Sequence, residues 1–281
     1  MGCAASTPVV EKAPPEPLPT LASLQAVELL EGEPPLTSGE DNFTSNDQVQ
    51  QLIFRNIQQS SKGSTFQLET YEDALFHKLQ IHPSKPGLGV KKRLEDLVHM
   101  HYEGQLEQPL AFCSKNPSKG LNYFLIMSPK PLREGQQPMK KLEGPTFCPN
   151  VYPYARVEFD LQEQIGKVHL VGERAGDPPL YTIHQCNPKV WVVKRQKIGP
   201  CAAMEQVHGI AKLTCYRVAF GAGTDPVLMS LFNVCIDMFL QAAKTQRWNF
   251  CPAAQRRNVQ SVDWEPLDAA TATKLFGRRG P

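Results

Sequence analysis

The stretch that decides the fold is Gly221-Ala-Gly-Thr-Asp225-Pro226, followed by the apolar run Val227-Leu-Met-Ser-Leu-Phe-Asn-Val-Cys-Ile-Asp-Met-Phe-Leu-Gln-Ala-Ala243. Asp225 or Thr224 can cap a helix, and Pro226 suits the first helical position. The run is apolar almost all round, so the helix is either buried on every side or spans a membrane. The sequence therefore predicts one strong hydrophobic helix near the C-terminus.

Three polar residues in this run distinguish the two environments. Ser230, Asn233 and Asp237 lie at i, i+3 and i+7, on one narrow stripe. A run of about 18 residues that contains a carboxylate is short and polar for a membrane span. We therefore expect a protein-enclosed helix whose polar stripe reaches a groove or barrel mouth, with a transmembrane helix as the alternative. The enclosed helix predicts four core side chains: Leu231, Phe232, Ile236 and Phe239.

Segments with strand character precede the helix. They are residues 121–127, 154–161, 167–171, 180–184, 189–194 and 210–220. Turn-forming pairs such as Asn187-Pro188 and Gly199-Pro200 separate several of them. This regular spacing predicts an antiparallel meander that closes into a barrel or a sandwich. Upstream, apolar residues at helical spacing predict two amphipathic helices, at 45–59 and 90–102.

This combination resembles the tubby C-terminal-like superfamily, and within it the LURP-one-related and phospholipid-scramblase-like members. The match runs from about Tyr154 to Ala243, roughly a third of the chain, and is most specific from Val218 through Asp237. The resemblance implies a closed barrel around a hydrophobic helix. It also implies membrane-facing, non-enzymatic roles, either phosphoinositide binding through basic residues or lipid translocation. No local motif transfers the family's lipid-binding residues, and the scramblase-type cysteine cluster is absent.

We therefore predict a β-rich α+β fold, an antiparallel β-barrel around a hydrophobic C-terminal helix. A disordered N-terminal tether with short helices precedes the barrel. Residues 1–62 are assigned to the tether, 63–255 to the globular domain and 256–281 to a basic, flexible tail. The tether assignment follows from the prolines and scattered acids of the first 42 or so residues, which cannot bury enough apolar surface to offset chain entropy.

The chain begins Met1-Gly2-Cys3-Ala-Ala-Ser6, the pattern of an acylation signal. Removal of Met1 exposes the Gly2 amine for myristoylation, and Ser6 is the small hydroxyl residue that such signals favour. Cys3 lies beside Gly2 and can be palmitoylated. Because one myristoyl chain binds a bilayer only marginally and two acyl chains anchor stably, the pair predicts an anchor. We expect the protein at the cytoplasmic face of a membrane, with the plasma membrane as the favoured site.

The charge distribution supports a need for the second acyl chain. Residues 1–62 hold eight acids and three bases, a net charge of −5. Because the whole chain has a net charge of +2, residues 63–281 carry a net charge of +7. An acidic tether cannot supply the polybasic second signal that often assists a myristoyl group. In the globular part, Lys189, Lys194, Arg195 and Lys197 flank Trp191. They are our candidates for a lipid-headgroup site, with ordinary solubilising charge as the alternative.

Cysteine and histidine give no catalytic or metal signature. The eight cysteines form no CxxC pair, and no HExxH motif, phosphate loop or GxSxG motif is present. Cys148, Cys186, Cys201, Cys215 and Cys235 lie in apolar contexts and are expected in the core. His99 and His101 would point to the same side only if their segment were a strand. That segment is predicted to be helical, so the two are not expected to act together. We therefore assign no catalytic residue, metal or cofactor.

The sequence thus favours a membrane-anchored, non-enzymatic lipid-binding or regulatory adaptor. Its partners would be membrane lipids, either an anionic phospholipid or a phosphoinositide, and the near-neutral net charge argues against nucleic acid. Two alternatives stay open: a membrane-tethered enzyme, thiol-based or acting on lipid, and a scramblase-like protein. Protein partners and oligomeric state are left undetermined.

Overall fold

The computed structural model describes part of the chain. The described residues are 24–27, 33–37, 50–60, 63–70, 79–83, 97–102, 105, 107–115, 123–139, 150–160, 165–172, 176–208 and 214–245. Within them there are twelve strands and one helix, α1 (Pro226–Thr245). The strands are β1 (Gln50–Ser60), β2 (Gly63–Thr70), β3 (Leu79–Pro83), β4 (Leu97–Tyr102), β5 (Ala111–Lys115), β6 (Tyr123–Ser128), β7 (Tyr152–Asp160), β8 (Ile165–Leu170), β9 (Tyr181–Asn187), β10 (Val190–Arg195), β11 (Gly199–His208) and β12 (Thr214–Phe220).

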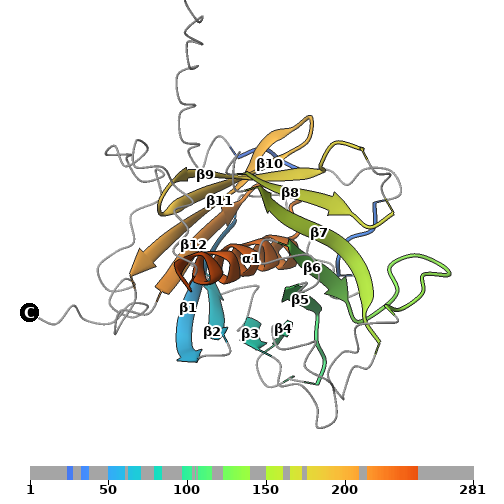
Figure 1. Ribbon diagram of the computed structural model, residues 1–281, viewed down its shortest axis with the longest axis horizontal. Helices are drawn as coiled ribbons and strands as arrows, with labels where there is room; N and C mark the ends of the chain where they lie inside the picture. Colours follow the sequence, from blue (N-terminus) through green and yellow to red (C-terminus); the bar gives the residue numbers. More distant parts are fainter. Residues whose placement is uncertain are drawn as a thin grey trace, which may run out of the picture.

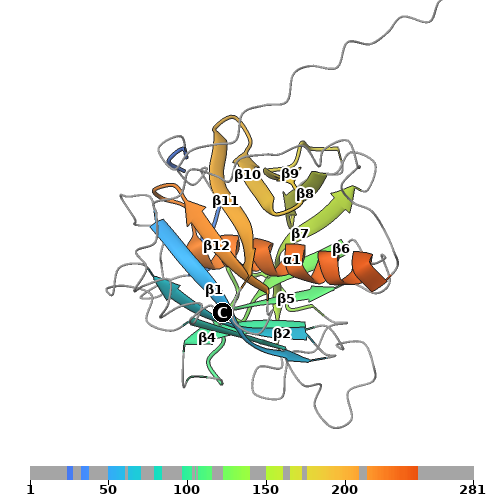
Figure 2. The same cartoon turned by 90° about the vertical axis from the view of Figure 1, so that its left-hand side faces the viewer.

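Every strand pairs antiparallel with its neighbour in the chain, and β1 also pairs with β12. The pairing order is therefore that of a closed barrel, β1-β12-β11-β10-β9-β8-β7-β6-β5-β4-β3-β2. Figures 1 and 2 show α1 in the space between the two sides of this sheet, with β8–β11 on one side and β1, β2, β4 and β5 on the other. The predicted β-rich α+β fold, with antiparallel strands and one apolar C-terminal helix, is confirmed.

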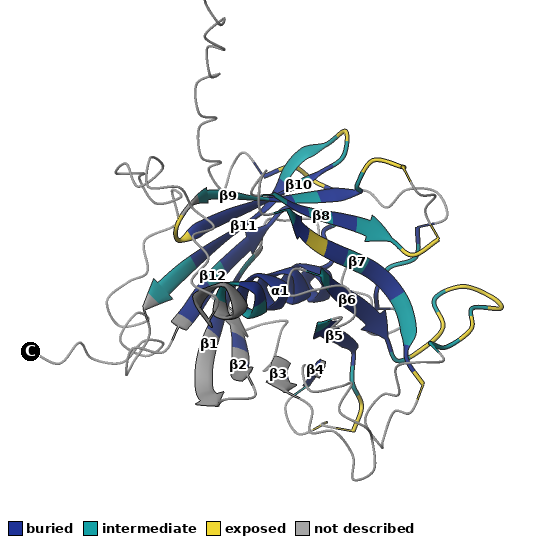
Figure 3. Cartoon of the chain, viewed as in Figure 1, coloured by how far each residue is buried: buried dark blue, intermediate teal, exposed yellow. Residues whose placement is uncertain are grey.

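Strand β7 illustrates why these segments are strands. Ala155, Val157 and Phe159 are fully buried in the main core, whereas Arg156 and Glu158 between them are not. Successive side chains of a strand point to opposite faces of the sheet, so this alternation places the apolar side chains on the buried face and the charged ones on the other. The inward side chains of the strands pack against α1, whose visible part is dark blue in Figure 3 along most of its length.

The four helix residues expected in the core are all fully buried: Leu231, Phe232, Ile236 and Phe239 have exposed fractions of 0%. Phe239 stacks on Phe159 of β7, with ring centroids 4.5 Å apart, and Phe159 meets Trp191 of β10 edge to face. Phe232 meets Tyr181 of β9 edge to face, with centroids 5.6 Å apart. Aromatic contacts therefore join the helix directly to β7 and β9 of the surrounding sheet.

The polar stripe of α1 does not reach a groove, contrary to our expectation. Ser230 and Asn233 are fully buried, and Asp237 is 6% exposed. The Ser230 hydroxyl donates to the carbonyl oxygen of Pro226, and the Tyr216 hydroxyl donates to the Asp237 carboxylate at 2.6 Å. The stripe is thus enclosed within the fold, and Ser230 and Asp237 find partners in the protein.

The two predicted upstream helices are wrong where the structure describes them. Residues 50–60 form β1 and residues 97–102 form β4. In β1, Leu52 and Phe54 are two residues apart and both face the main core. In β4, Val98 and Met100 do the same. A short apolar run fits the spacing of a helix or of a strand. These two segments are strands because they pair with strands that lie elsewhere in the chain.

The folded body also begins earlier than predicted. We placed residues 1–62 in a tether, but β1 lies between β2 and β12 in the sheet, and residues 24–27 and 33–37 carry buried side chains. The folded part therefore begins before residue 63. Gly2, Cys3 and the predicted tail at 256–281 lie outside the described residues.

Candidate functional site where α1 begins

An N-terminal strap, residues 24–27 and 33–37, packs against the end of the sheet at which α1 begins. The Gln25 amide donates to the carbonyl oxygen of Pro200, and the Val27 amide donates to that of Ala222, both at 2.8 Å. Leu24 is buried in a small cluster with three residues of the neighbouring strands: Val190, Ala203 and Ala219. The strap is thus held by backbone hydrogen bonds and by apolar packing.

Two glycines of the turn before α1 make room for the strap. A Cβ atom built on Gly221 would lie 2.1 Å from the carbonyl oxygen of Gln25, and one on Gly223 would lie 2.1 Å from that of Val27. Gly223 also has a φ of +69°, which glycine adopts readily. The glycine-rich start signal of the helix therefore doubles as the seat of the strap.

A buried ion pair joins the strap to β10. The Arg195 guanidinium donates to both carboxylate oxygens of Glu33 and to the hydroxyl of Tyr181, and the charged side chains are only 1% and 3% exposed. Burial alone would lower the pKa of Arg195, but the Glu33 carboxylate and Tyr181 outweigh it and raise that pKa. The two buried charges neutralise each other, so neither is available to a ligand.

Asp225, the residue before α1, lies beside the strap and caps the helix. Its Oδ1 accepts the amides of Val227 and Leu228 at 2.8 and 3.2 Å, as expected of a helix cap. Burial raises the pKa of the Asp225 carboxyl to about 6, against the opposing effect of the backbone amides of Leu228, Val227, Leu36 and Thr37. The strap residues Leu36 and Thr37 therefore act on the carboxylate that begins α1.

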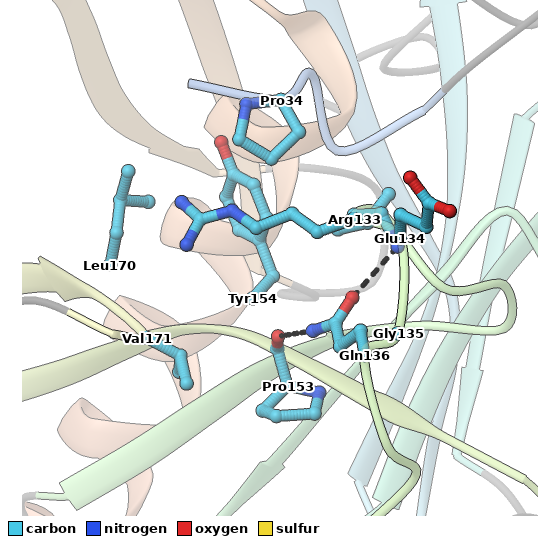
Figure 4. Close-up of a pocket in the computed structure, with 10 residues that line it drawn as sticks. Pro34, Arg133, Glu134, Gly135, Gln136, Pro153, Tyr154, Leu170 and Val171 are labelled. Carbon is cyan, nitrogen blue, oxygen red and sulfur yellow. Dashed lines mark hydrogen bonds between the residues drawn. The ribbon is translucent and has the colours of Figure 1, made fainter. Parts of the chain in front are cut away.

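A cavity of about 260 Å³ opens beside the strap. Its walls are Pro34, the loop after β6 (Leu132 to Gln136), Pro153 and Tyr154 of β7, and Leu170 and Val171 at the end of β8 (Figure 4). Gln136 fixes the loop, because its Oε1 accepts the Leu132 amide at 2.7 Å and its Nε2 donates to the Pro153 carbonyl oxygen at 2.8 Å. This wall is therefore built by specific hydrogen bonds.

The structure does not bring the four predicted headgroup residues together. Arg195 is buried in the ion pair with Glu33, so its assignment to a lipid site is wrong. Lys189 lies exposed in the turn before β10, whereas Lys194 and Lys197 lie at the other end of that strand. Five residues of strand separate Lys189 from Lys194 by roughly 16 Å. The basic cluster seen in the sequence is thus split between two ends of β10.

Most of the cysteine residues that the structure describes are buried, as are His99 and His101, whereas Cys148 lies outside the described residues. Cys201, Cys215 and Cys235 are buried as expected, and Cys186 is half-buried. Burial raises the pKa of Cys201 to about 12 and also raises that of Cys235, whose Sγ lies 3.4 Å from Cys113 Sγ. Because β4 is a strand, His99 and His101 share one face and stack with centroids 5.2 Å apart. The described residues contain no group of three or more side chains that could hold a metal ion.

Several residues of this site were not singled out by the sequence. Glu33 was one acid among eight in the supposed tether, and Arg133, Gln136 and Tyr154 carried no motif. No family model, curated protein or solved structure matches the chain. The part of the chain that the structure describes has no helix long and apolar enough to cross a membrane.

Proposed function

We propose that this protein is a membrane-anchored, non-enzymatic lipid-binding or regulatory adaptor, built on a tubby-like barrel that encloses α1. The observation that carries the proposal is the docking of the N-terminal strap. The strap continues the segment that bears the acylation signal at Gly2 and Cys3, and it ends beside the cavity. An anchor at the N-terminus would therefore present this end of the fold to the membrane.

Chain geometry sets how closely the anchor would hold the domain. Residues 4–23 connect Cys3 to the first described strap residue, Leu24. Twenty residues reach at most roughly 70 Å when fully extended. Anionic lipid near a tethered domain adds about 1 kcal/mol for each nearby Lys or Arg. Lys189, Lys194 and Lys197 remain candidates for this diffuse attraction, without Arg195.

Two features favour a binding role over the alternative of a thiol enzyme. A catalytic cysteine acts as the thiolate, which needs a lowered pKa and access to substrate. Cys113, Cys201, Cys215 and Cys235 are at most 1% exposed, and burial raises the pKa of Cys201 and Cys235. The residues that line the cavity include neither cysteine nor histidine. Lipid translocation, the scramblase-like alternative, has no support from the geometry of the cavity.

The test of the anchor is Gly2→Ala. Without a myristoylated amine at Gly2, the protein should move from the membrane fraction to the cytosol. Cys3→Ser should leave the weak, reversible binding of a single acyl chain. The measurement is fractionation of cells that express each variant, with the myristoyl group read by mass spectrometry. The melting temperature of Gly2→Ala should equal that of the wild type, which controls for misfolding. Full membrane retention of Gly2→Ala would overturn the proposal.

A further inference from the structure

Two polar groups in the cavity beside the strap have no partner in the described part of the protein. The first is the hydroxyl of Tyr154, a residue that is 5% exposed. In Figure 4 its ring rises from β7 and its oxygen points toward Pro34, away from the hydrogen-bonded Gln136. Burial raises the pKa of Tyr154 well above its ordinary value, and Tyr181, Asp225 and Glu33 add to the rise. The phenol therefore keeps its proton and can donate it to an acceptor in the cavity.

The second group is the guanidinium of Arg133. The side chain lies along the cavity in Figure 4, while the carboxylate of Glu134 points away from it. A Cβ atom at Gly172 would lie 3.2 Å from Arg133 Nη1, so the glycine leaves the space that the guanidinium occupies. Arg133 has no ion pair with any described residue. An unneutralised guanidinium faces the same space as an unpartnered phenol.

Besides Glu134 and Gln136, the remaining side chains that line the cavity are apolar. Leu170, Pro153 and Pro34 line the cavity, and Val171 is 37% exposed at its side, the large hydrophobic side chain most open to solvent in the described chain. The volume of about 260 Å³ is slightly below the range of about 300–1,000 Å³ that is usual for drug-sized ligands. The space therefore suits a small polar group with a short apolar extension.

We propose that this cavity binds an anionic acid group, phosphate or carboxylate, carried on an apolar stem. A guanidinium presents paired donors that match the oxygens of either acid. The Tyr154 hydroxyl donates a further hydrogen bond, and the stem lies against Leu170, Val171 and Pro34. The inference deepens the proposed function, because a phospholipid headgroup is one source of such an acid. A soluble ester or a short fatty acid is the other source.

The strap takes part in this site. Pro34 lines the cavity and the preceding residue, Glu33, is fixed by Arg195. A ligand that contacts Pro34 stabilises the docked strap, and by linkage a docked strap strengthens binding of the ligand. Binding should thus be accompanied by slower proteolysis in the strap.

The experiment uses the full chain with Gly2→Ala, so that acylation cannot contribute to binding. Hexyl phosphate, hexanoate and inorganic phosphate are titrated in solution by calorimetry. Phosphatidylcholine vesicles with and without phosphatidylglycerol form the membrane arm. Arg133→Gln should weaken binding of hexyl phosphate or hexanoate about ten- to a hundred-fold, because it removes a charge-assisted contact. Tyr154→Phe, which keeps the ring, should weaken it about two- to ten-fold.

Lys130→Gln is the matched control. It removes one exposed positive charge three residues from Arg133, and Lys130 does not line this cavity. It should leave the affinity for the soluble acids unchanged. Saturable binding of a soluble acid without vesicle binding supports the site and assigns it a soluble ligand, and binding in both arms supports a headgroup. Equal losses for Arg133→Gln and Lys130→Gln, or no saturable binding of any probe, would overturn the site. Because anchoring is tested separately through Gly2, either result leaves that part of the account standing.

Discussion

Replacement of Phe232 by alanine is expected to lower the free energy of unfolding by about 3–5 kcal/mol. Phe232 lies in the middle of α1, is fully buried and packs edge to face on Tyr181 of β9. The substitution removes this contact and leaves a cavity that strands on both sides of the helix cannot collapse to fill. Since domains are stable by only about 5–15 kcal/mol, the yield of soluble protein should fall sharply.

Denaturant unfolding measures this loss, and two variants serve as controls. Phe232→Leu keeps much of the apolar volume and should cost clearly less than Phe232→Ala. Val171→Ala truncates a side chain that is 37% exposed and should change stability by no more than about 0.5 kcal/mol. A cost below about 1 kcal/mol for Phe232→Ala would show that the sheet does not enclose α1 as described.

Substitution of Arg195 by methionine is expected to destabilise the protein by about 3–5 kcal/mol as well. The change leaves the Glu33 carboxylate buried, 3% exposed, with its counter-charge removed. Glu33→Leu alone should have a similar cost, because it leaves the Arg195 guanidinium without a carboxylate. The combined variant Arg195→Met with Glu33→Leu should recover most of the loss, since an apolar pair of similar volume replaces an ion pair at little cost.

The readout is the coupling free energy from a double-mutant cycle of these variants, measured by denaturant unfolding. In Arg195→Met, the strap could instead undock so that Glu33 becomes hydrated. The loss of unfolding free energy would then be limited to the free energy that docks the strap, and protease would cut within residues 24–37. Additive losses of less than about 1 kcal/mol each, the magnitude of a surface pair, would contradict a buried ion pair.

The elements that the sequence predicted correctly carry their own local signals. α1 has a cap at Asp225, a proline at its first position and a surface that is apolar apart from one narrow polar stripe. From Ala155 to Phe159, β7 alternates buried side chains with side chains that are half-buried or exposed. In both cases the pattern that predicts the element lies within the segment itself. The prediction therefore does not depend on which other segment it packs against.

The errors concern segments whose structure depends on distant partners. Residues 50–60 have apolar spacing that fits either a helix or a strand, and the choice follows from pairing with β2 and β12. The prolines and acids of the strap predict exposure, yet the strap is held by Arg195 and by the glycines that precede α1. Arg195 was assigned to the surface by its charge, and only a partner 162 positions away explains its burial.

The cavity was hidden from sequence reasoning for a related reason. Its walls come from four separate segments, namely the strap, the loop after β6, the start of β7 and the end of β8. Arg133 and Tyr154 are 21 positions apart in the chain and belong to no motif. Only the folded sheet places the unneutralised guanidinium and the unpartnered phenol against one space.

The central claim is that the segment following the proposed acylation signal is docked on the fold, and hydrogen exchange at two amides tests it most directly. The amides of Gln25 and Val27 donate to carbonyl oxygens of Pro200 and Ala222. Exchange of both in the full-length protein should be slower by roughly two orders of magnitude or more than in a peptide of residues 1–40, because it requires the strap to open. Exchange of both amides at the rate of the peptide would contradict the docked strap and, with it, the proposed placement of an anchor beside the cavity.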